Sequence, residues 1–280
     1  MRIGGPTVQL RDKVVVVTGA GRGIGAALAT RFAAEGAKGV AVSDVDGDNA
    51  ESVAAAIRDK GGEAIALRTD VTDAAQVKAL AEAAESAFGP VDLFCSNAGI
   101  ATGQNEDAPA EVWAATWAVN VMAHVHGVNA VLPGMLERGG GYFLHTVSAA
   151  GLLTCPGDAP YTATKHAAIG FAEWVAMTYG AAGIEVSTLC PLGVRTQMLM
   201  PGVESGNSSA LAVAASGDII EPEDVAEAAV LGLADERFLI LPHAKVAKMY
   251  AGKAADVDGW LGGMRHVFGT RNETPGTVAR

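Results

Sequence analysis

The junction between a β-branched run and a glycine-rich loop near the start of the chain constrains the fold most. Residues 14–17 are four consecutive valines without polar alternation, which indicates a strand buried on both faces, as in parallel sheets. The run continues into the loop Thr18-Gly19-Ala20-Gly21-Arg22-Gly23-Ile24-Gly25 and a helical segment at 26–35. A second strand at 40–43 follows and leads to Asp44. This order predicts a βαβ unit that binds a dinucleotide.

The residues of this unit also indicate how a dinucleotide would bind. Glycines in the loop let the backbone approach the pyrophosphate, and the start of the following helix offers free N–H groups and a partial positive charge. Asp44 is expected to accept hydrogen bonds from the adenosine ribose hydroxyls and to repel a 2′-phosphate, which favours NAD(H) over NADP(H). Capping of the next helix is the alternative role for Asp44.

The alternation of helices and strands continues along the chain. Strands are expected at 64–67, 92–96, 141–147, 184–189 and 238–241. Helices are expected at 47–60, from a cap at Thr72 or Asp73 to near 88–90, at 109–138 and around Tyr161. This pattern predicts an α/β fold of the Rossmann type, a doubly wound, seven-stranded parallel sheet with helices on both faces. Residues 1–280 are expected to form a single NAD-binding domain with its core at about 12–241.

Two segments outside this alternation have their own expected roles. Residues 191–220 are broken by glycine, serine and asparagine but carry several apolar side chains, which favours a mobile substrate lid over an ordinary surface insertion. Residues 244–270 are expected to form one or two helices that cover a neighbouring chain or the lid. The leader Met1–Pro6 and the terminal segment Arg271–Arg280 are expected to be flexible.

Charge and cysteine content exclude several classes of function. The net charge of −11 provides no basic field for a nucleic acid or an anionic membrane, and no apolar run is long enough to span a bilayer. The three cysteines have no metal-ligand spacing, which favours reduced, packed thiols in a cytoplasmic protein. His124 and His126 should point in different directions on a helix, and His145 and His166 are expected to be packing or surface residues, so no metal site is predicted.

A tyrosine and a lysine at helical spacing form a candidate proton-transfer pair. Tyr161 and Lys165 project from one face of a helix that Asp158 would cap. A phenol normally loses its proton near pH ~10, and a nearby ammonium lowers this pKa. Such pairs are also common on solvated helix faces, so the spacing alone leaves both interpretations open.

Taken together, these motifs resemble the shorter, single-domain branch of the short-chain dehydrogenase/reductase family. The resemblance covers about residues 12–241 and follows the TGxxxGxG spacing of the glycine loop rather than the GxxGxxG spacing of the extended branch. The matching residues, in the expected order, are Thr18, Gly19, Gly23, Gly25, Asp70, Val71, Asn97, Ala98, Gly99, Asn120, Ser148, Tyr161 and Lys165.

The resemblance implies a role for each of four catalytic residues. Tyr161 would exchange a proton with the substrate oxygen while hydride moves to or from the nicotinamide, and Ser148 would hydrogen-bond that oxygen. Lys165 would bind the nicotinamide ribose and lower the pKa of Tyr161. Asn120 would anchor, through its helix backbone, a water in a proton relay to Lys165.

The resemblance also implies the cofactor contacts. Asp70 and Val71 would lie beside the adenine, and residues 97–99 would form the floor. Arg22 matches a position that is often basic in members that use NADP. The complete expected set is Gly19, Arg22, Gly23, Ile24, Gly25, Asp44, Asp70, Val71, Asn97, Ala98, Gly99, Tyr161, Lys165, Pro191, Val194 and Thr196. Residues 191–196 depart from the family pattern, because the glycine of Pro-Gly is displaced by Leu192 to position 193.

The sequence thus predicts an NAD(H)-dependent oxidoreductase that interconverts a secondary alcohol and a ketone. An apolar substrate face (Ala150, Leu152, Leu192, Met198 and Met200) favours a neutral, largely apolar small molecule. A cofactor-binding regulatory or scaffold protein and an NAD-retaining epimerase or dehydratase are the alternatives. Trp113, Trp117 and Trp174 are expected in the core or at a subunit interface, and the family resemblance implies a homotetramer or homodimer.

Overall fold

The fold is built on a single large parallel sheet, and the computed structural model describes it over residues 10–269. The leader and the terminal segment for which flexibility is expected lie outside the described residues. The sheet has the strand order β3-β2-β1-β4-β5-β6-β9, and all its pairs are parallel. Its strands are β1 (Val14–Thr18), β2 (Gly39–Asp44), β3 (Ala64–Arg68), β4 (Leu93–Ser96), β5 (Gly141–Thr146), β6 (Ile184–Leu189) and β9 (Leu239–Ile240).

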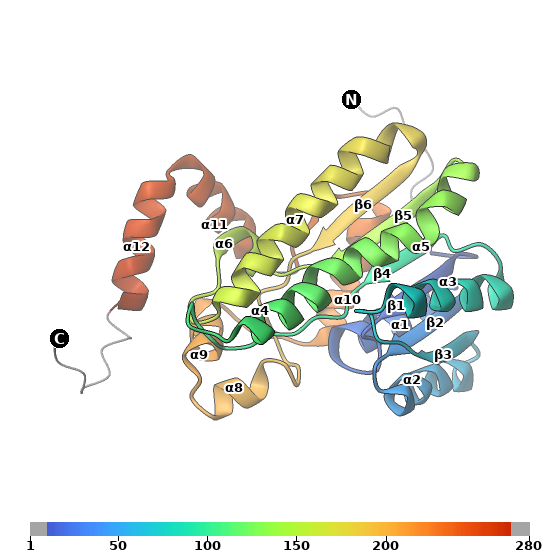
Figure 1. The fold of residues 1–280 in the computed structure, drawn as a ribbon, viewed down its shortest axis with the longest axis horizontal. Helices are drawn as coiled ribbons and strands as arrows, with labels where there is room; N and C mark the ends of the chain where they lie inside the picture. Colours follow the sequence, from blue (N-terminus) through green and yellow to red (C-terminus); the bar gives the residue numbers. More distant parts are fainter. Residues whose placement is uncertain (1–9, 270–280) are drawn as a thin grey trace.

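Helices cover both faces of this sheet, which confirms the predicted doubly wound α/β fold (Figure 1). One face packs against α1 (Gly23–Ala34), α2 (Gly47–Asp59) and α10 (Pro222–Ala234). The other packs against α3 (Ala74–Phe88), α5 (Ala123–Glu137) and α7 (Ala159–Tyr179). The strand order reverses at β1, so the loops after β1 and β4 leave the same edge of the sheet in different directions, where α/β proteins bind ligands.

The expected continuous helix at 109–138 is interrupted in the structure. It consists of α4 (Ala110–Trp117), a π-helical turn over Ala118–Met122, and α5. A π turn inserts one residue into the helical repeat. The residues of this turn, 118–122, include no proline or glycine, and the apolar periodicity of the sequence does not reveal the insertion. The insertion matters because Asn120 lies within it.

The prediction of an irregular segment at 191–220 was wrong. The segment contains β7 (Gly193–Val194) paired with β8 (Ile219–Ile220), and the helices α8 (Met200–Glu204) and α9 (Ser208–Ser216). Only two of the residues that suggested a loop separate these helices: Gly206, which adopts a φ of 78°, and Asn207, whose side chain caps α9.

The C-terminal part of the described chain forms two helices, α11 (Ala244–Ala255) and α12 (Val257–Gly269). Figure 1 shows α12 extending away from the sheet, beyond α11 and the short helix α6 (Ala150–Leu153). Among residues 10–269, no helix is both long enough and apolar enough to cross a membrane.

The close contact between α5 and the sheet generates a test of the packing. A Cβ atom added at Gly127 would lie 2.5 Å from Cε1 of the fully buried Phe94. We expect Gly127→Ala to destabilise the protein by about 1–3 kcal/mol, because overpacking outweighs the better helix propensity of alanine. The matched control is Gly252→Ala on exposed α11, where an added Cβ meets nothing within 4 Å and a gain of about 0.5–1 kcal/mol is expected. Equal effects in chemical denaturation would contradict this account.

Candidate active site

A single cavity of about 1030 Å³ opens at the carboxyl ends of the strands and collects most of the predicted site residues. All sixteen residues of the expected cofactor set line it, together with Ser148. The parallel sheet explains this convergence, because every strand ends at the same edge.

The glycine loop after β1 is held by side chains that follow β4. The Asn97 amide donates to the carbonyls of Thr18 and Gly19 at 3.0 and 3.1 Å, while the Thr18 hydroxyl accepts from the backbone of Asn97 at 3.0 Å. Gly19 has a φ of 61°, and an added Cβ would lie 2.7 Å from the Cα of Ala98. At Gly25 an added Cβ would lie 2.2 Å from the Gly19 oxygen, so both positions exclude side chains.

The donor and acceptor groups of this loop fit a dinucleotide. Helix α1 begins without a side-chain cap or an acid in its first turn, so no residue of the helix itself neutralises its positive end, and residues 23–25 line the cavity. Asp44 accepts from the backbone N–H groups of Gly21 (2.9 Å) and Asp46 (3.1 Å). The structure assigns the cap of α2 to Asp46, not to Asp44. Asp44 therefore presents a carboxylate at the end of β2, as ribose recognition requires.

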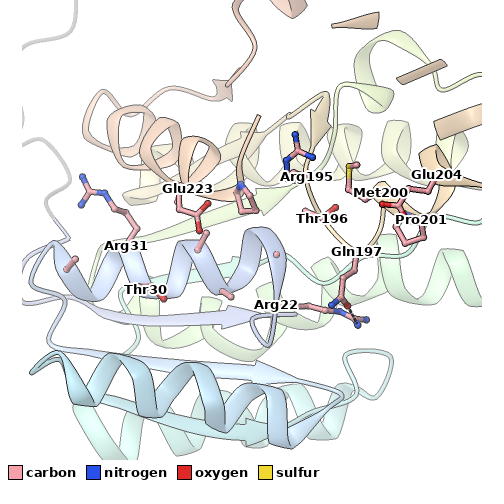
Figure 2. Close-up of a pocket in the computed structure, with 16 residues that line it drawn as sticks. Arg22, Thr30, Arg31, Arg195, Thr196, Gln197, Met200, Pro201, Glu204 and Glu223 are labelled. Atoms are coloured by element: carbon pink, nitrogen blue, oxygen red, sulfur yellow. Dashed lines mark hydrogen bonds between the residues drawn. The ribbon is translucent and has the colours of Figure 1, made fainter. Parts of the chain in front are cut away.

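Arg22 connects the glycine loop to the segment 191–220. Its Nη1 donates to Oε1 of Gln197 at 2.8 Å, as Figure 2 shows. The pair lies between the main cavity and a second cavity of about 650 Å³ lined by α1, α8 and α10. Met200, expected in the substrate pocket, lines this second cavity and not the main one. It is the first residue of α8, a helix that the sequence did not reveal.

Asp158 fixes the start of α7, the helix that carries Tyr161 and Lys165. Its buried carboxylate accepts from the backbone N–H groups of Tyr161 (3.0 Å), Thr102 (2.7 Å) and Gly103 (2.7 Å), and from the Thr102 hydroxyl (2.8 Å). The sequence predicted the capping role of Asp158 and missed its bonds to residues 102–103. The carboxylate thus ties the loop after β4 to the first turn of α7.

Tyr161 and Lys165 lie one turn apart beside Ser148. The Lys165 Nζ lies 5.5 Å from the centroid of the Tyr161 ring and donates to the carbonyl of Thr146 at 3.1 Å. Burial raises the pKa of Tyr161, and a hydrogen bond with Ser148 opposes this shift. Burial also lowers the pKa of Lys165 to about 8. The expected lowering of the Tyr161 pKa by Lys165 is therefore not found in the protein alone, since desolvation of the phenolate is the largest effect.

Asn120 lies beneath the cavity rather than in its wall. Its Oδ1 accepts from the N–H of Ile100 at 2.9 Å, and its Nδ2 donates to the Ile100 carbonyl (2.9 Å) and the Thr164 hydroxyl (3.1 Å). A Cβ added at Gly99 would lie 3.4 Å from both Asn120 Oδ1 and Lys165 Nζ, which places these groups near one another. Because the side chain is fully engaged, Asn120 can serve a relay only through its backbone in the π turn.

The region beside Ser148 and Tyr161 is largely apolar. Of the residues expected in the substrate pocket, Ala150, Leu192 and Met198 line the cavity, together with Leu153. Leu152 does not; it packs in a core cluster with Ile169 and Val246, because adjacent residues of helix α6 point in different directions. The sequence also missed a further wall of the cavity, formed by Met249, Trp260, Met264 and Phe268 of the two C-terminal helices.

A histidine that the sequence did not single out holds the backbone where the family pattern is broken. The Nδ1 of His243 accepts from the N–H of Leu192 at 3.1 Å, so its proton lies on Nε2. That atom faces the carbonyls of Gly193 (3.1 Å) and Asp218 (3.2 Å). His243 therefore supports the displaced glycine and joins the two ends of the segment 191–220.

The remaining predictions concern cysteines, tryptophans and metals. Cys95, Cys155 and Cys190 are free and buried, in agreement with packed thiols. Trp117 and Trp174 are 46% and 51% exposed, which excludes a place in the core of the single chain. Within residues 10–269, no group of three or more histidine, cysteine or acidic side chains could hold a metal ion.

Comparison with known proteins agrees with this geometry. The family model for short chain dehydrogenases matches residues 13–205, so the chain belongs to that family, whose similar members are oxidoreductases acting on CH–OH groups. One relative is 1-deoxy-11-beta-hydroxypentalenate dehydrogenase of Streptomyces exfoliatus. The two sequences are 35% identical over an alignment that covers 84% of this chain and 85% of the relative. This chain is also 35% identical to 2,5-dichloro-2,5-cyclohexadiene-1,4-diol dehydrogenase LinX of Sphingobium indicum, with 81% and 91% of the two chains covered.

A solved structure shows the same fold. A short chain dehydrogenase/reductase from Burkholderia phymatum in complex with NAD has a TM-score of 0.81 and 33% identity, over 90% of this chain and 96% of that one. The relatives and this neighbour together support a nicotinamide cofactor for the family.

The buried ammonium of Lys165 predicts a conflict between stability and function. With its pKa lowered to about 8 from 10.5, the protonated side chain costs folding free energy at neutral pH. We expect Lys165→Met to raise the free energy of unfolding at pH 7 by about 3 kcal/mol, because the pKa is lowered from 10.5 to about 8 and each pKa unit corresponds to about 1.4 kcal/mol.

The sign of this effect depends on pH. Between pH 8 and 10.5 the folded wild type has released the proton that the unfolded chain still binds, so wild-type stability gains from Lys165 as pH rises. The advantage of the variant should therefore narrow over this interval when the two proteins are compared by denaturation at each pH. A variant less stable than wild type at pH 7 would contradict a costly buried charge.

Proposed function

We propose that this protein is an NAD(H)-dependent oxidoreductase that interconverts a secondary alcohol and a ketone on a neutral, largely apolar small molecule. The observation that carries the proposal is the meeting, in one cavity, of Tyr161 and Ser148 with a glycine loop and the Asp44 carboxylate. Tyr161 and Ser148 can hydrogen-bond the reacting oxygen of a substrate. The glycine loop and Asp44 can bind the pyrophosphate and the ribose of a dinucleotide.

The protein groups divide the proton chemistry between them. When bound, the nicotinamide supplies or accepts the hydride. Tyr161 gives its phenolic proton to the ketone oxygen in reduction and takes the alcohol proton in oxidation. The Ser148 hydroxyl hydrogen-bonds the same oxygen and keeps it within reach of Tyr161. Lys165, held by the Thr146 carbonyl, binds the ribose hydroxyls and places a positive charge one turn from Tyr161.

The lining of the cavity supports an apolar substrate. Leu153, Leu192, Met198 and Trp260 contribute side chains without charge. The two curated relatives are named for a hydroxylated compound and for a cyclic diol. Both names support an alcohol group as the part of the substrate that reacts.

Preference for NAD(H) follows from charge at the end of β2. The Asp44 carboxylate would lie beside the 2′-phosphate of NADP(H), and burying two anions together is unfavourable. The Arg22 guanidinium, which donates to Gln197, would partly offset this repulsion, but an arginine at the cavity edge does not remove the charge of Asp44. The Asp44 carboxylate therefore supports the unphosphorylated cofactor.

Two alternative functions would give a different result in an assay that follows NADH absorbance. A regulatory or scaffold protein would bind NADH without turnover across a panel of secondary alcohols and ketones. An epimerase or dehydratase would convert substrate without net change in NADH absorbance. The hydroxyl, phenol and ammonium grouped beside the apolar cavity favour the dehydrogenase.

We also propose a cytoplasmic homotetramer or homodimer formed by a single-domain chain. Trp117 of α4 and Trp174 of α7 are about half exposed on helices that contact one another, which suits a subunit interface. Light scattering tests the assembly, and a monomer at micromolar concentration would contradict it.

Removal of the Tyr161 hydroxyl tests the assignment of the acid/base. We expect Tyr161→Phe to reduce kcat by about 10²-fold or more, because proton transfer is lost, while the Kd for NADH stays within about threefold of wild type. Turnover is followed by NADH absorbance and binding by NADH fluorescence. Substantial activity in the variant would show that another group transfers the proton.

Neutralising Asp44 tests the cofactor preference. Wild type should use NADH with a higher kcat/KM than NADPH. We expect Asp44→Asn to reduce this ratio about tenfold or more, because the amide can still accept from Gly21 but no longer repels a phosphate. The control is Asp48→Asn, which removes an exposed charge from the first turn of α2 outside the cavity. An unchanged ratio in Asp44→Asn, or a wild-type preference for NADPH, would contradict the assignment.

A further inference from the structure

Two buried histidines form a hydrogen bond beneath the proposed active site. The Nδ1 atoms of His124 on α5 and His145 on β5 lie 2.8 Å apart, with ring centroids separated by 4.8 Å. Both side chains are essentially inaccessible to solvent. The mechanism proposed above uses neither residue.

The contact requires two neutral rings in opposite tautomers. One Nδ1 must carry a proton and donate it, while the other accepts. Burial lowers the pKa of His124 and lowers that of His145 to about 3, so neither ring is charged near neutral pH. The two Nε2 atoms have no hydrogen-bond partner within residues 10–269. The Nδ1–Nδ1 hydrogen bond is therefore a directional contact in surroundings that offer these two rings no other hydrogen-bond partner among the residues that the structure describes, so its loss would leave a buried polar atom unpaired.

The two histidines are surrounded by residues of β4, β5 and α7. Phe143 of β5 stacks parallel to His145 at 6.1 Å, and Phe171 of α7 meets it edge-on at 6.2 Å. Ser96 of β4 is the strand partner of His145 and also has an unpartnered buried hydroxyl. The nearby charged group is Lys165 of α7, whose ammonium contributes to the lowered pKa of His124.

Both histidines are close in sequence to backbone segments that lie beside Lys165, the π turn for His124 and the end of β5 for His145. His124 follows Asn120 by four residues and is the second residue after the π turn. His145 precedes Thr146, whose carbonyl accepts from Lys165 Nζ at 3.1 Å. The bond thus joins the helix that carries Asn120 to the strand that holds Lys165 and leads to Ser148.

We propose that His124 and His145 are positioning residues that fix the π turn against β5 and so hold the Lys165 ammonium in place for catalysis. Two apolar side chains could fill the same space at a lower desolvation cost. Apolar contacts, however, are not directional, whereas this hydrogen bond fixes the distance and the angle between α5 and β5. The role in catalysis rests on the proposed dehydrogenase function.

A double-mutant cycle separates this role from a purely structural one. The variants are His124→Leu, His145→Leu, the double variant and His124→Asn. Each is measured for melting temperature, the Kd for NADH, kcat, and the pH of half-maximal turnover. Each single leucine variant should melt at a lower temperature, because it leaves a buried Nδ1 unpaired, and the double variant should recover most of this loss.

Catalysis should not recover in the double variant. We expect kcat to stay about tenfold below wild type and the pH of half-maximal turnover to shift, because Lys165 is no longer held at one distance from Thr146. The Kd for NADH should rise severalfold, since Lys165 contacts the cofactor. In His124→Asn the amide can still donate to His145, so kcat and the pH profile should lie near wild type.

Each contrary outcome is distinguishable. Recovery of kcat, the pH profile and the Kd together with the melting temperature would limit the pair to stability and overturn the proposal. If the leucine variants do not fold, a tenfold loss of kcat in His124→Asn at an unchanged melting temperature overturns it. If wild type binds NADH but turns over no substrate, the dehydrogenase proposal fails, and an unchanged Kd for NADH in the double variant then refutes positioning of Lys165.

Discussion

The parallel pairing of β1 with both β2 and β4 decides where the functional groups of this protein lie. Because the three strands run in one direction, the glycine loop, the Asp44 carboxylate and the amide of Asn97 all emerge at one edge of the sheet. The reversal of strand order at β1 separates the chain on either side and opens the cavity there. The bonds from Asn97 to Thr18 and Gly19 then fasten the two central loops to each other. A fixed loop lets backbone N–H groups take the place of cationic side chains in binding an anion.

Buried polar groups organise the other half of the site. The Asp158 carboxylate joins the loop at 102–103 to the start of α7, and the Thr146 carbonyl holds the Lys165 ammonium. These groups cost desolvation free energy, which appears as the lowered pKa of Lys165 and the raised pKa of Tyr161. The protein thus stabilises its fold with the apolar layers on both faces of the sheet and accepts a less stable arrangement at the strand ends.

Much of the fold could be predicted because its signals are local. A run of valines, a glycine spacing and an acid at a strand end each report on a few neighbouring residues, and parallel sheets then impose the arrangement. The same reasoning failed where packing between distant elements decides the outcome. Helix α9 depends on a cap by Asn207 and on burial of Ala210 and Ala212, which a glycine-rich stretch does not suggest. Leu152 and Met200 are apolar residues near the site that turn away from the cavity.

The sequence by itself determined the class of fold, the place of the dinucleotide loop and the helical spacing of Tyr161 and Lys165, because these follow from periodicity and backbone geometry. Only the tertiary structure decided the protonation energetics and the supporting contacts. Burial, which no spacing measures, reversed the expected direction of the Tyr161 pKa in the protein alone. The bond between His124 and His145 joins residues twenty-one positions apart on different elements, and the bonds of His243 to Leu192 and Gly193 span about fifty. Such contacts exist only once helices have packed on the sheet in one register, since hydrogen bonds depend on distances that sequence separation does not set.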